Sequence, residues 1–365
     1  MIDLANVLEI FDQSLIAKMK FEFTPDVSRP LSLLSHCPAY ETTPIRKISS
    51  SEPFQILIKD ETDRMGLGAF KALGGVYAVA QFLIEEWLAE NQEALSADQL
   101  MNPQIQAWAN DKTFVCASAG NHGMAVAKGA QLFNAKCRVH LSESVSPVFE
   151  QRLAALGAKV IRSGENYEES MELAKLDAEQ NLAILLADSS WPEYFRLPSL
   201  VMEGYTVIAE ELRVAFSEER KWPTHVFLQA GVGGIAAAMA FEIRSKWAQQ
   251  PQIIIVEPEA APCLRESVQR GEVSIVTGPI SEMGRLDCKE PSLIAFEVLK
   301  EHADEFVLIS EDEAEQGMKF LQEQNIATTT SGAAGLAAAL KHKNLRIDLT
   351  NNDTVLVIAT EGIPS

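Results

Sequence analysis

A lysine stands between an aromatic residue and small residues in the stretch Lys59 to Tyr77, where Phe70, Lys71 and Ala72 follow a loop with two glycines. Burial among apolar groups disfavours the charged ammonium and so lowers the pKa of a lysine. A neutral amine near pH 7 can act as a nucleophile or form an imine with a carbonyl group. Lys71 is therefore a candidate catalytic lysine, although a surface lysine whose stem lies across Phe70 and Leu73 fits these residues too.

A glycine-rich turn far downstream could hold a phosphate. The stretch Val226 to Met239 reads VFLQAGVGGIAAAM, in which an apolar run ends at Ala230, passes through glycines and enters an alanine-rich helix. Successive backbone N–H groups in such a turn, with the positive end of the helix dipole, bind phosphate without a basic side chain. The turn lacks the Gly-Lys-Ser/Thr of a Walker motif and the GxGxxG spacing of dinucleotide sites. Taken alone, it is also explained by the steric need for glycine in a tight turn.

Two further turns place polar residues just before a helix. In CASAGNHGMA, from Cys116 to Ala125, a short strand breaks at Ser118 to Gly120 and a helix begins at Asn121. In TTTSGAAGL, from Thr328 to Leu336, hydroxyl residues and glycine lead into another alanine-rich helix. With Lys71 and the glycine-rich turn, these make four elements that could contribute to one site.

The four elements, in this order, resemble the fold type II pyridoxal-phosphate enzymes, and among them the diaminopropionate ammonia-lyases. The resemblance covers the chain from about Tyr40 to its end, and the segments that carry it are RMGLGAFKALGG around Lys71, ASAGNHG around Asn121, ADSSWPEYFRLPSLVMEGY from Ala187 to Tyr205, AGVGG, APCLRES and LDCKEPS. It implies an α/β fold with two doubly wound sheets and the cofactor, pyridoxal phosphate, in the cleft between them.

The resemblance also implies which residues bind the cofactor. Lys71 would be joined to pyridoxal phosphate through an imine, and the cofactor would serve as the electron sink for loss of the Cα proton. Phe70 would pack against the cofactor, although a plain core position suits it nearly as well. The phosphate would lie in the turn made by Gly231, Val232, Gly233, Gly234 and Ile235.

Two polar side chains would hold the cofactor ring. Asn121 would donate to the phenolic oxygen, with a helix N-cap as the alternative role. Ser331 would face the pyridine nitrogen, and Thr330 is the alternative because adjacent hydroxyl residues leave the register open. A hydroxyl in place of a carboxylate keeps that nitrogen largely unprotonated and makes the ring a weaker electron sink, which suits elimination.

The loop Ser118, Ala119, Gly120, Asn121 and His122 would bind the α-carboxylate of the substrate through its N–H groups, with His122 as a structural residue. Ala119 departs from the ammonia-lyases, which have an aspartate here that acts as the base on the D-isomer. The SAGNHG form is that of the serine/threonine dehydratases, and a methyl group cannot accept a proton. Asp188 matches the family's other acidic residue and would act as a base or bind the second amine of the substrate. Its alternative role is to cap a loop.

The resemblance implies α,β-elimination on an L-amino acid with a leaving group on Cβ, giving a keto acid and ammonia. Lys71 or Asp188 would take the Cα proton. Three hypotheses remain: a diaminopropionate-type ammonia-lyase, a hydroxy-amino-acid dehydratase, and a non-catalytic relative that binds the cofactor or an amino acid as a regulator. A homodimer is expected.

Composition sets the class of protein. The chain has 365 residues, of which 47% are hydrophobic and 22% charged, so it can form large cores. Its formal net charge of −20 argues against binding to nucleic acid or to an anionic membrane surface. No apolar run approaches the ~20 residues of a membrane span, and Met1 to Lys20 lacks the layout of a signal peptide. We expect a cytosolic protein.

Five cysteines lack the CxxC spacing of a zinc site and are too few for a disulfide framework, so no metal site is expected. Most fit buried apolar positions. Because the ammonia-lyases have cysteines in the matching segments near the mouth of the active site, Cys263 and Cys288 could pair in a disulfide.

The elements that position these residues alternate between strands and helices, which indicates βαβ units and parallel sheets. Leu4 to Lys18 is predicted as a helix, followed by coil and a strand at 54–59, a helix at 70–90 and a polar connection at 91–111. Strands are predicted at 113–117, 137–141, 159–162, 182–187, 225–230, 252–257, 305–310 and 354–360. Helices are predicted at 121–133, 147–156, 167–179, from the 188–194 loop through 212, and at 234–247, 291–302, 311–323 and 332–341, with a loop-rich stretch up to 289. We expect residues 1–108 and 212–365 to form a large cofactor-binding domain and residues 109–211 a small one.

Overall fold

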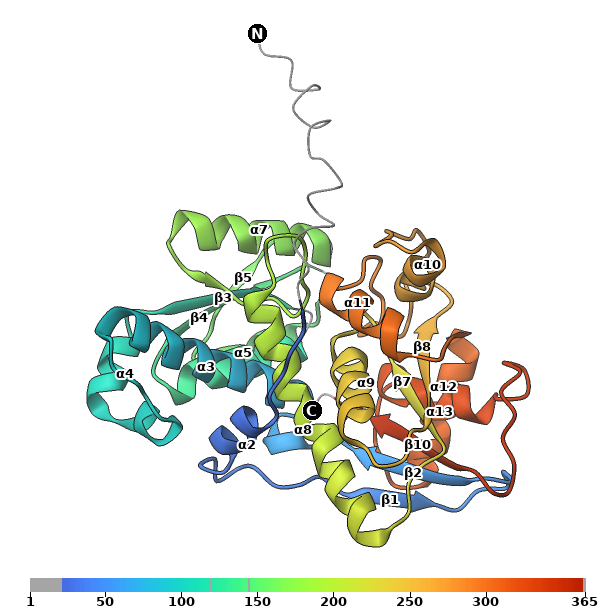
Figure 1. The fold of residues 1–365 in the computed structure, drawn as a ribbon. Helices are drawn as coiled ribbons and strands as arrows, with labels where there is room; N and C mark the ends of the chain where they lie inside the picture. The colour runs from blue at the N-terminus through green and yellow to red at the C-terminus, as the bar shows by residue number, and fades with distance from the viewer. Residues whose placement is uncertain (1–21, 119, 144, 364–365) are drawn as a thin grey trace.

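The computed structural model describes residues 22–118, 120–143 and 145–363, and within them the strands form two separate sheets (Figure 1). The helix expected at Leu4 to Lys18 lies outside the described residues. Helices cover both sheets, as predicted for a doubly wound α/β fold. The domain boundaries themselves stay a prediction.

The larger sheet, within the described residues, has six strands in the order β1-β2-β10-β7-β8-β9. All neighbouring strands are parallel except β1, which pairs antiparallel with β2. Every residue of β7 is buried, as expected for a parallel strand covered on both faces. The strands are β1 (Ile45–Ile48), β2 (Gln55–Asp60), β7 (His225–Gln229), β8 (Gln252–Pro258), β9 (Glu305–Ile309) and β10 (Thr354–Ala359).

Side chains of β7 alternate between two hydrophobic clusters, because successive residues of a strand point to opposite faces. Val226 and Leu228 join the cluster that contains α8 (Arg196–Glu219), α9 (Gly234–Lys246) and α11 (Leu293–His302). Phe227 joins the cluster on the other face, formed by α12 (Glu311–Glu323) and α13 (Thr330–Leu340).

The smaller sheet, as far as the chain is described, has four parallel strands in the order β5-β4-β3-β6. Phe114 and Cys116 of β3 face the cluster with α3 and α5, and Val115 and Ala117 face α7. The elements are β3 (Thr113–Ala117), β4 (Lys136–Leu141), β5 (Lys159–Arg162), β6 (Ile184–Leu185), α3 (Lys71–Asn91), α5 (Asn121–Leu132), α6 (Pro147–Ala155) and α7 (Tyr167–Gln180).

Helix α8 runs between the two sheets and packs against α3 on one side and α9 on the other (Figure 1). Glycines allow the first of these contacts to be close. A Cβ added at Gly204 would lie 2.6 Å from the carbonyl oxygen of Leu73 and 2.8 Å from the Cα of Gly74. The backbones of α3 and α8 therefore touch at this crossing.

The predicted elements are confirmed over most of the chain, and the exceptions are short or depend on distant contacts. The stretch preceding β2, expected as coil, contains α2 (Ser28–Leu34) and the edge strand β1. The 91–111 connection contains a 3₁₀ helix at Ala97–Met101 and α4 (Pro103–Ala109). A further helix, α10 (Cys263–Arg270), lies in the stretch expected to be loop, α8 extends beyond 212 to Glu219, and the strand expected at 182–187 is only Ile184–Leu185.

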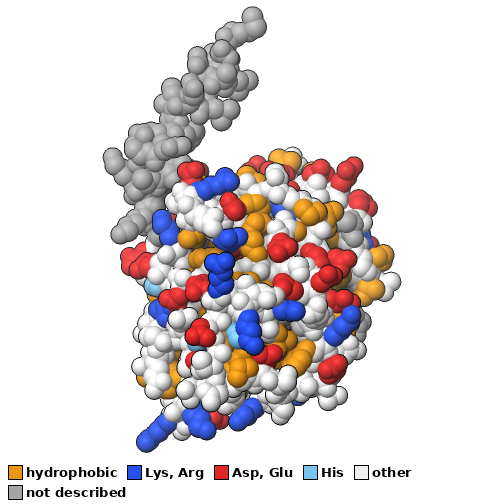
Figure 2. Space-filling model, turned by 90° about the vertical axis from the view of Figure 1, so that its right-hand side faces the viewer, with side chains coloured by type: hydrophobic (Ala, Val, Ile, Leu, Met, Phe, Trp, Pro, Cys, Tyr) orange, Lys and Arg blue, Asp and Glu red, His pale blue; other side chains and the backbone are white. Residues whose placement is uncertain are grey.

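Acidic and basic side chains are interspersed on the face of the molecule drawn in Figure 2. No helix among the described residues is both long enough and apolar enough to cross a membrane.

Gly74→Ala should destabilise the fold, because the new methyl group would lie 2.5 Å from the carbonyl oxygen of Val201 and against Cε1 of Tyr205. Overpacking of this kind typically costs about 1–3 kcal/mol. Gly284→Ala is the matched control, since its added Cβ has no atom within 4 Å. Thermal unfolding of both variants checks the prediction, and equal midpoints would show that the α3–α8 crossing can relax.

Candidate active site

A cavity of about 160 Å³ lies where residues from both sheets meet, and it brings together most of the residues predicted from the sequence. Those that line it are Phe70, Lys71, Ser118, Gly120, Asn121, His122, Asp188, Gly231, Val232, Gly233, Gly234 and Ile235. Ala119 lies outside the described residues. Ser331 is not among the residues lining the cavity.

Lys71 is the first residue of α3 and follows a tight loop after β2. The loop has three residues in the left-handed region: Met65 with φ 54°, Gly66 with φ 69° and Gly68 with φ 79°. Lys71 Nζ lies 5.3 Å from the centroid of the Phe70 ring and 5.7 Å from that of Tyr205. The lysine is thus held at the cavity between two aromatic rings, as its apolar neighbours suggested, and the surface-lysine alternative is wrong.

Lys71 also forms an ion pair that the sequence did not reveal. Its Nζ donates to Oδ2 of Asp188 at 2.5 Å, and both side chains are largely buried. Asp188 follows the end of the smaller sheet, in the loop before α8. The carboxylate therefore contacts the lysine across the cavity, which is a larger role than the loop cap considered for it.

Burial alone would lower the pKa of Lys71, but the Asp188 carboxylate outweighs burial and raises it above the ordinary value. On Asp188 burial alone would raise the pKa, whereas the positive charge of Lys71 lowers it. Both groups are therefore ionised at pH 7. The expected lowering of the Lys71 pKa is wrong for this state, because it considered the apolar neighbours without the carboxylate.

The turn from Gly231 to Ile235 lines the cavity, and its glycines allow close packing against neighbouring segments. Gly233 has φ +97°, and a Cβ there would lie 2.9 Å from Cβ of Ala295. A Cβ on Gly231 would lie 2.9 Å from Sγ of Cys288. The turn leads directly into α9, whose first N–H groups have no partner within the helix and carry the positive end of its dipole. These residues fit a phosphate group.

Asn121 is the first residue of α5, and Gly120 occupies the N-cap position. The N-cap alternative for Asn121 is therefore wrong. Its Nδ2 donates to Oε2 of Glu361, a buried carboxylate that also lines the cavity. Glu361 accepts a second bond from Oγ1 of Thr329 at 2.6 Å and lies 3.5 Å from Nε of Arg285. A polar cluster thus joins the Asn121 loop to the end of β10.

The Ser331 hydroxyl is directed to the backbone, where it accepts a bond from the N–H of Arg285 at 3.1 Å. Thr330 donates to the carbonyl oxygen of Glu282 at 3.3 Å, at an exposed position. The hydroxyl residue from this side that lines the cavity is Thr360, whose Oγ1 accepts from Nε2 of Gln229 at 3.3 Å. Neither Ser331 nor Thr330 is among the residues that line the cavity, whereas Arg285, whose N–H bonds to Ser331, is one of them.

His122 is buried, and its Nε2 contacts the carbonyl oxygen of Leu186 at 2.8 Å. Burial lowers its pKa, so the ring is neutral at pH 7. Ser118 shapes the same loop, since its Oγ accepts bonds from the N–H groups of Gly120 at 3.0 Å and Gly123 at 2.8 Å. These contacts agree with a structural role for His122.

All five cysteines are free thiols, including the pair for which a disulfide was considered. Cys288 lines the cavity, and burial raises the pKa of its thiol to about 12. The Sγ of Cys263 lies 3.6 Å from the carbonyl oxygen of Gly231. Both thiols thus adjoin the glycine-rich turn.

Sequence reasoning missed Tyr205, Arg285, Thr360 and Glu361. Thr360 and Glu361 follow β10, and ligands of open α/β sheets bind beyond the carboxyl ends of the strands. That rule could have identified both residues. Tyr205 belongs to a segment that carries the family resemblance, but nothing in its neighbours indicates a contact with Lys71.

Comparisons with known proteins agree with this geometry. Residues 37–361 match the family described as "Pyridoxal-phosphate dependent enzyme". The chain is 33% identical over 323 residues to the diaminopropionate ammonia-lyase of Escherichia coli K12, covering 84% of this chain and 80% of that protein. It is 30% identical over 255 residues to the L-threonine ammonia-lyase of Geobacter sulfurreducens, covering 69% of this chain and 59% of that protein.

The fold is also similar to a solved structure, the Escherichia coli diaminopropionate ammonia lyase in complex with an aminoacrylate-PLP azomethine reaction intermediate. The TM-score is 0.82 at 28% identity, over 94% of this chain and 92% of that one.

Lys71→Met should change how stability depends on pH, because Asp188 would then be buried without its cation. Its folded pKa would rise above the unfolded value of about 3.9, so the folded state would hold a proton that the unfolded state lacks. Stability then falls as pH rises, and the variant should be more stable at pH 5 than at pH 7, relative to wild type. In wild type the depressed pKa of Asp188 gives the opposite trend, a loss of stability in acid.

Urea unfolding between pH 4.5 and pH 8 measures this difference. The double variant Lys71→Met/Asp188→Asn is the control. It lacks the Asp188 carboxylate and should not gain stability as the pH falls from 7 to 5. If the free energy of unfolding of Lys71→Met depends on pH as in wild type, Asp188 pairs with another cation or becomes solvated in the variant.

Proposed function

Because the chain belongs to the family of pyridoxal-phosphate dependent enzymes, we propose that it catalyses α,β-elimination on an amino acid with an amino group on Cβ, such as 2,3-diaminopropionate. The products are a keto acid and ammonia. The single observation that carries this proposal is the Lys71–Asp188 pair, at 2.5 Å, in a cavity that the glycine-rich turn also lines. The identity of 33% to a diaminopropionate ammonia-lyase supports the substrate class.

The residues of the cavity would hold the cofactor as follows. The N–H groups from Gly231 to Ile235 would bind its phosphate, Lys71 would bond to its aldehyde carbon, and Phe70 and Asn121 would contact its ring. Thr360, not Ser331, is the hydroxyl residue available for the ring nitrogen. When bound, pyridoxal phosphate delocalises the electron pair that loss of the Cα proton leaves behind.

Lys71 and Asp188 would move the protons. The Cα proton is transferred to Nζ of Lys71 or to the Asp188 carboxylate, and the Cβ–N bond breaks as the β-amine leaves as ammonia. The released enamine acid hydrolyses to the keto acid with loss of a second ammonia. Because its pKa is low, Asp188 stays ionised at pH 7 and can bind a cationic β-amine before reaction.

The α-carboxylate of the substrate would bind at the loop that precedes α5. Ser118 and Gly120 line the cavity beside the N-terminus of this helix, whose dipole favours an anion. Ala119 belongs to the same loop, and its methyl group removes a base that would serve the D-isomer. We therefore propose a preference for the L-isomer.

A hydroxy-amino-acid dehydratase is the second candidate. The SAGNHG loop favours it, and so does the identity of 30% to an L-threonine ammonia-lyase. The retained Asp188, facing the reacting lysine, favours a substrate with a second positive charge.

A homodimer and a cytoplasmic location are also part of the proposal. Light scattering on the purified protein measures the first, and cell fractionation measures the second.

The holoenzyme should release a keto acid from L-2,3-diaminopropionate faster than from L-serine or L-threonine. Lys71→Ala should abolish this activity, while Lys319→Ala, at an exposed lysine paired with Glu315, should retain it. Keto-acid release over a panel of both enantiomers checks the prediction. Turnover of the hydroxy-amino acids alone would establish the dehydratase, and no turnover despite bound cofactor would contradict both enzyme proposals.

Ala119→Asp should raise turnover of D-2,3-diaminopropionate and change the L-isomer much less, because it restores a carboxylate on one side of the substrate. General-base contributions are typically about 10²- to 10⁴-fold, so wild type should separate the two isomers by about that factor. Steady-state kinetics on each isomer measure the ratio. Equal rates for both isomers in wild type would contradict the argument from Ala119.

A further inference from the structure

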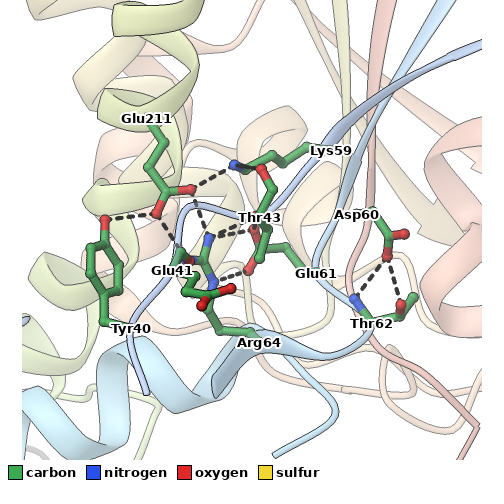
Figure 3. Close-up of polar contacts among 9 residues, drawn as sticks. All are labelled: Tyr40, Glu41, Thr43, Lys59, Asp60, Glu61, Thr62, Arg64 and Glu211. Carbon is green, nitrogen blue, oxygen red and sulfur yellow. Dashed lines mark hydrogen bonds and ion pairs between the residues drawn. The ribbon is translucent and has the colours of Figure 1, made fainter. Parts of the chain in front are cut away.

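A buried cluster of charges lies behind the loop that carries Lys71, and the proposed reaction does not use it. Lys59, Glu61 and Arg64 are each 0% exposed, and Glu211 of α8 points into the same cluster (Figure 3). Lys59 is in β2, and Arg64 is in the first half of the loop between β2 and α3. Its two basic and two acidic side chains balance in formal charge.

Glu211 binds both cations at once. Its Oε2 accepts from Nζ of Lys59 at 2.6 Å and from Nη2 of Arg64 at 2.8 Å, and its Oε1 accepts from Nη1 of Arg64 at 2.8 Å. Tyr40 donates its hydroxyl to Oε1 at 2.8 Å (Figure 3). Burial alone would raise the pKa of Glu211, but its bonds to Arg64 lower it, so the carboxylate stays charged.

The other end of the loop is docked on the same helix. The rings of Phe70 and Tyr205 meet edge to face with centroids 4.9 Å apart, and Tyr205 also lies beside Lys71. Tyr205 and Glu211 are separated by about 9 Å along the axis of α8, at about 1.5 Å per residue. One rigid helix therefore holds both the start and the end of the loop.

The loop needs such support, because it contains Gly66 and Gly68 in the left-handed region together with Met65. Glycines give a free chain many alternative conformations. Apart from side chains, backbone bonds join the loop to the end of β10 and the residues after it: from the N–H of Glu61 to Ala359 at 2.9 Å, from the N–H of Phe70 to Thr360 at 3.1 Å, and from the N–H of Gly362 to Gly68 at 2.9 Å.

We propose that Glu211 is a positioning residue for Lys71. By fixing Lys59 and Arg64 on α8, it sets where the loop ends and hence where Nζ of Lys71 meets Asp188 and the aldehyde of the cofactor. Displacement of a reacting group by about 1 Å can cost about 10²-fold in rate. The phosphate cradle precedes α9, and the hydrogen bonds of Glu211 go to Tyr40, Lys59 and Arg64 and not to the cradle.

The inference rests on the proposed role of Lys71, and its test needs no substrate. Glu211→Gln keeps the shape of the side chain and removes its charge. After mixing the apoenzyme with pyridoxal phosphate, the visible band of the lysine-bound cofactor should form about 10²-fold more slowly than in wild type. Affinity for pyridoxamine 5′-phosphate, which lacks the aldehyde and cannot bond to lysine, should change less than about threefold, because the cradle is intact.

Glu203→Gln is the matched control. Glu203 is a buried glutamate of the same helix, but it binds Arg29, the N–H of Asp26 and the Tyr77 hydroxyl, not the Lys71 loop. It should lose comparable thermal stability and form the band at the wild-type rate. Equal slowing in both variants would mean that Glu211 affects the rate only through the overall stability of the fold, which contradicts the proposal. A wild-type rate in Glu211→Gln would also overturn it.

If Glu211→Gln does not fold, Arg64→Lys replaces it, since lysine keeps the charge and loses the two-pronged bond to Glu211. Slower band formation with unchanged affinity for pyridoxamine 5′-phosphate is again expected, and a wild-type rate contradicts the proposal. A wild-type protein that never forms the band would instead show that the assignment of Lys71 fails.

Discussion

The contact between Lys71 and Asp188 joins segments 117 residues apart in the chain, and the rest of the structure is arranged to allow it. The lysine begins a helix that follows the larger sheet, and the carboxylate follows the smaller sheet. The two meet only if α3 and α8 approach as closely as Gly74 and Gly204 permit. A desolvated pair at 2.5 Å tolerates little displacement, because each charge would then be buried without its partner. The packing of the two sheets therefore also determines whether Lys71 and Asp188 can both be ionised.

The parts of the site that could be predicted from the sequence are local. Lys71, the Asn121 loop and the turn from Gly231 to Ile235 each lie within one strand–turn–helix unit, whose residues are adjacent in the chain. The residues adjacent to Thr360 and Glu361 in the chain do not mark them as site residues, because their place at the cavity depends on the position of β10 in the sheet. Only the rule that ligands bind beyond the carboxyl ends of strands points to them. The predicted lowering of the Lys71 pKa was wrong for the same reason, since Asp188, which raises this pKa, follows the other sheet.

The same distinction applies to the elements of the fold. Long apolar periodic segments were predicted nearly to their ends. The edge strand β1 has only four residues, half of them exposed, and it exists because β2 pairs with it. The cofactor proposal also fits the charge of the chain. In a protein of net charge −20, backbone N–H groups can hold a phosphate because the effect of distant carboxylates is screened within about 8 Å at physiological salt.

The strand order has a consequence for biosynthesis. In the larger sheet β2, from the N-terminal part of the chain, lies between β1 and β10, and β10 follows every other described strand in the chain. Until β10 has been synthesised, β2 and β7 have no partner between them and both expose unpaired backbone edges. The smaller sheet is complete once residue 185 has emerged and can form during translation. The larger sheet, and the cavity wall formed by Thr360 and Glu361, can close only after β10 has emerged, so the unpaired edges of β2 and β7 stay exposed to aggregation until then.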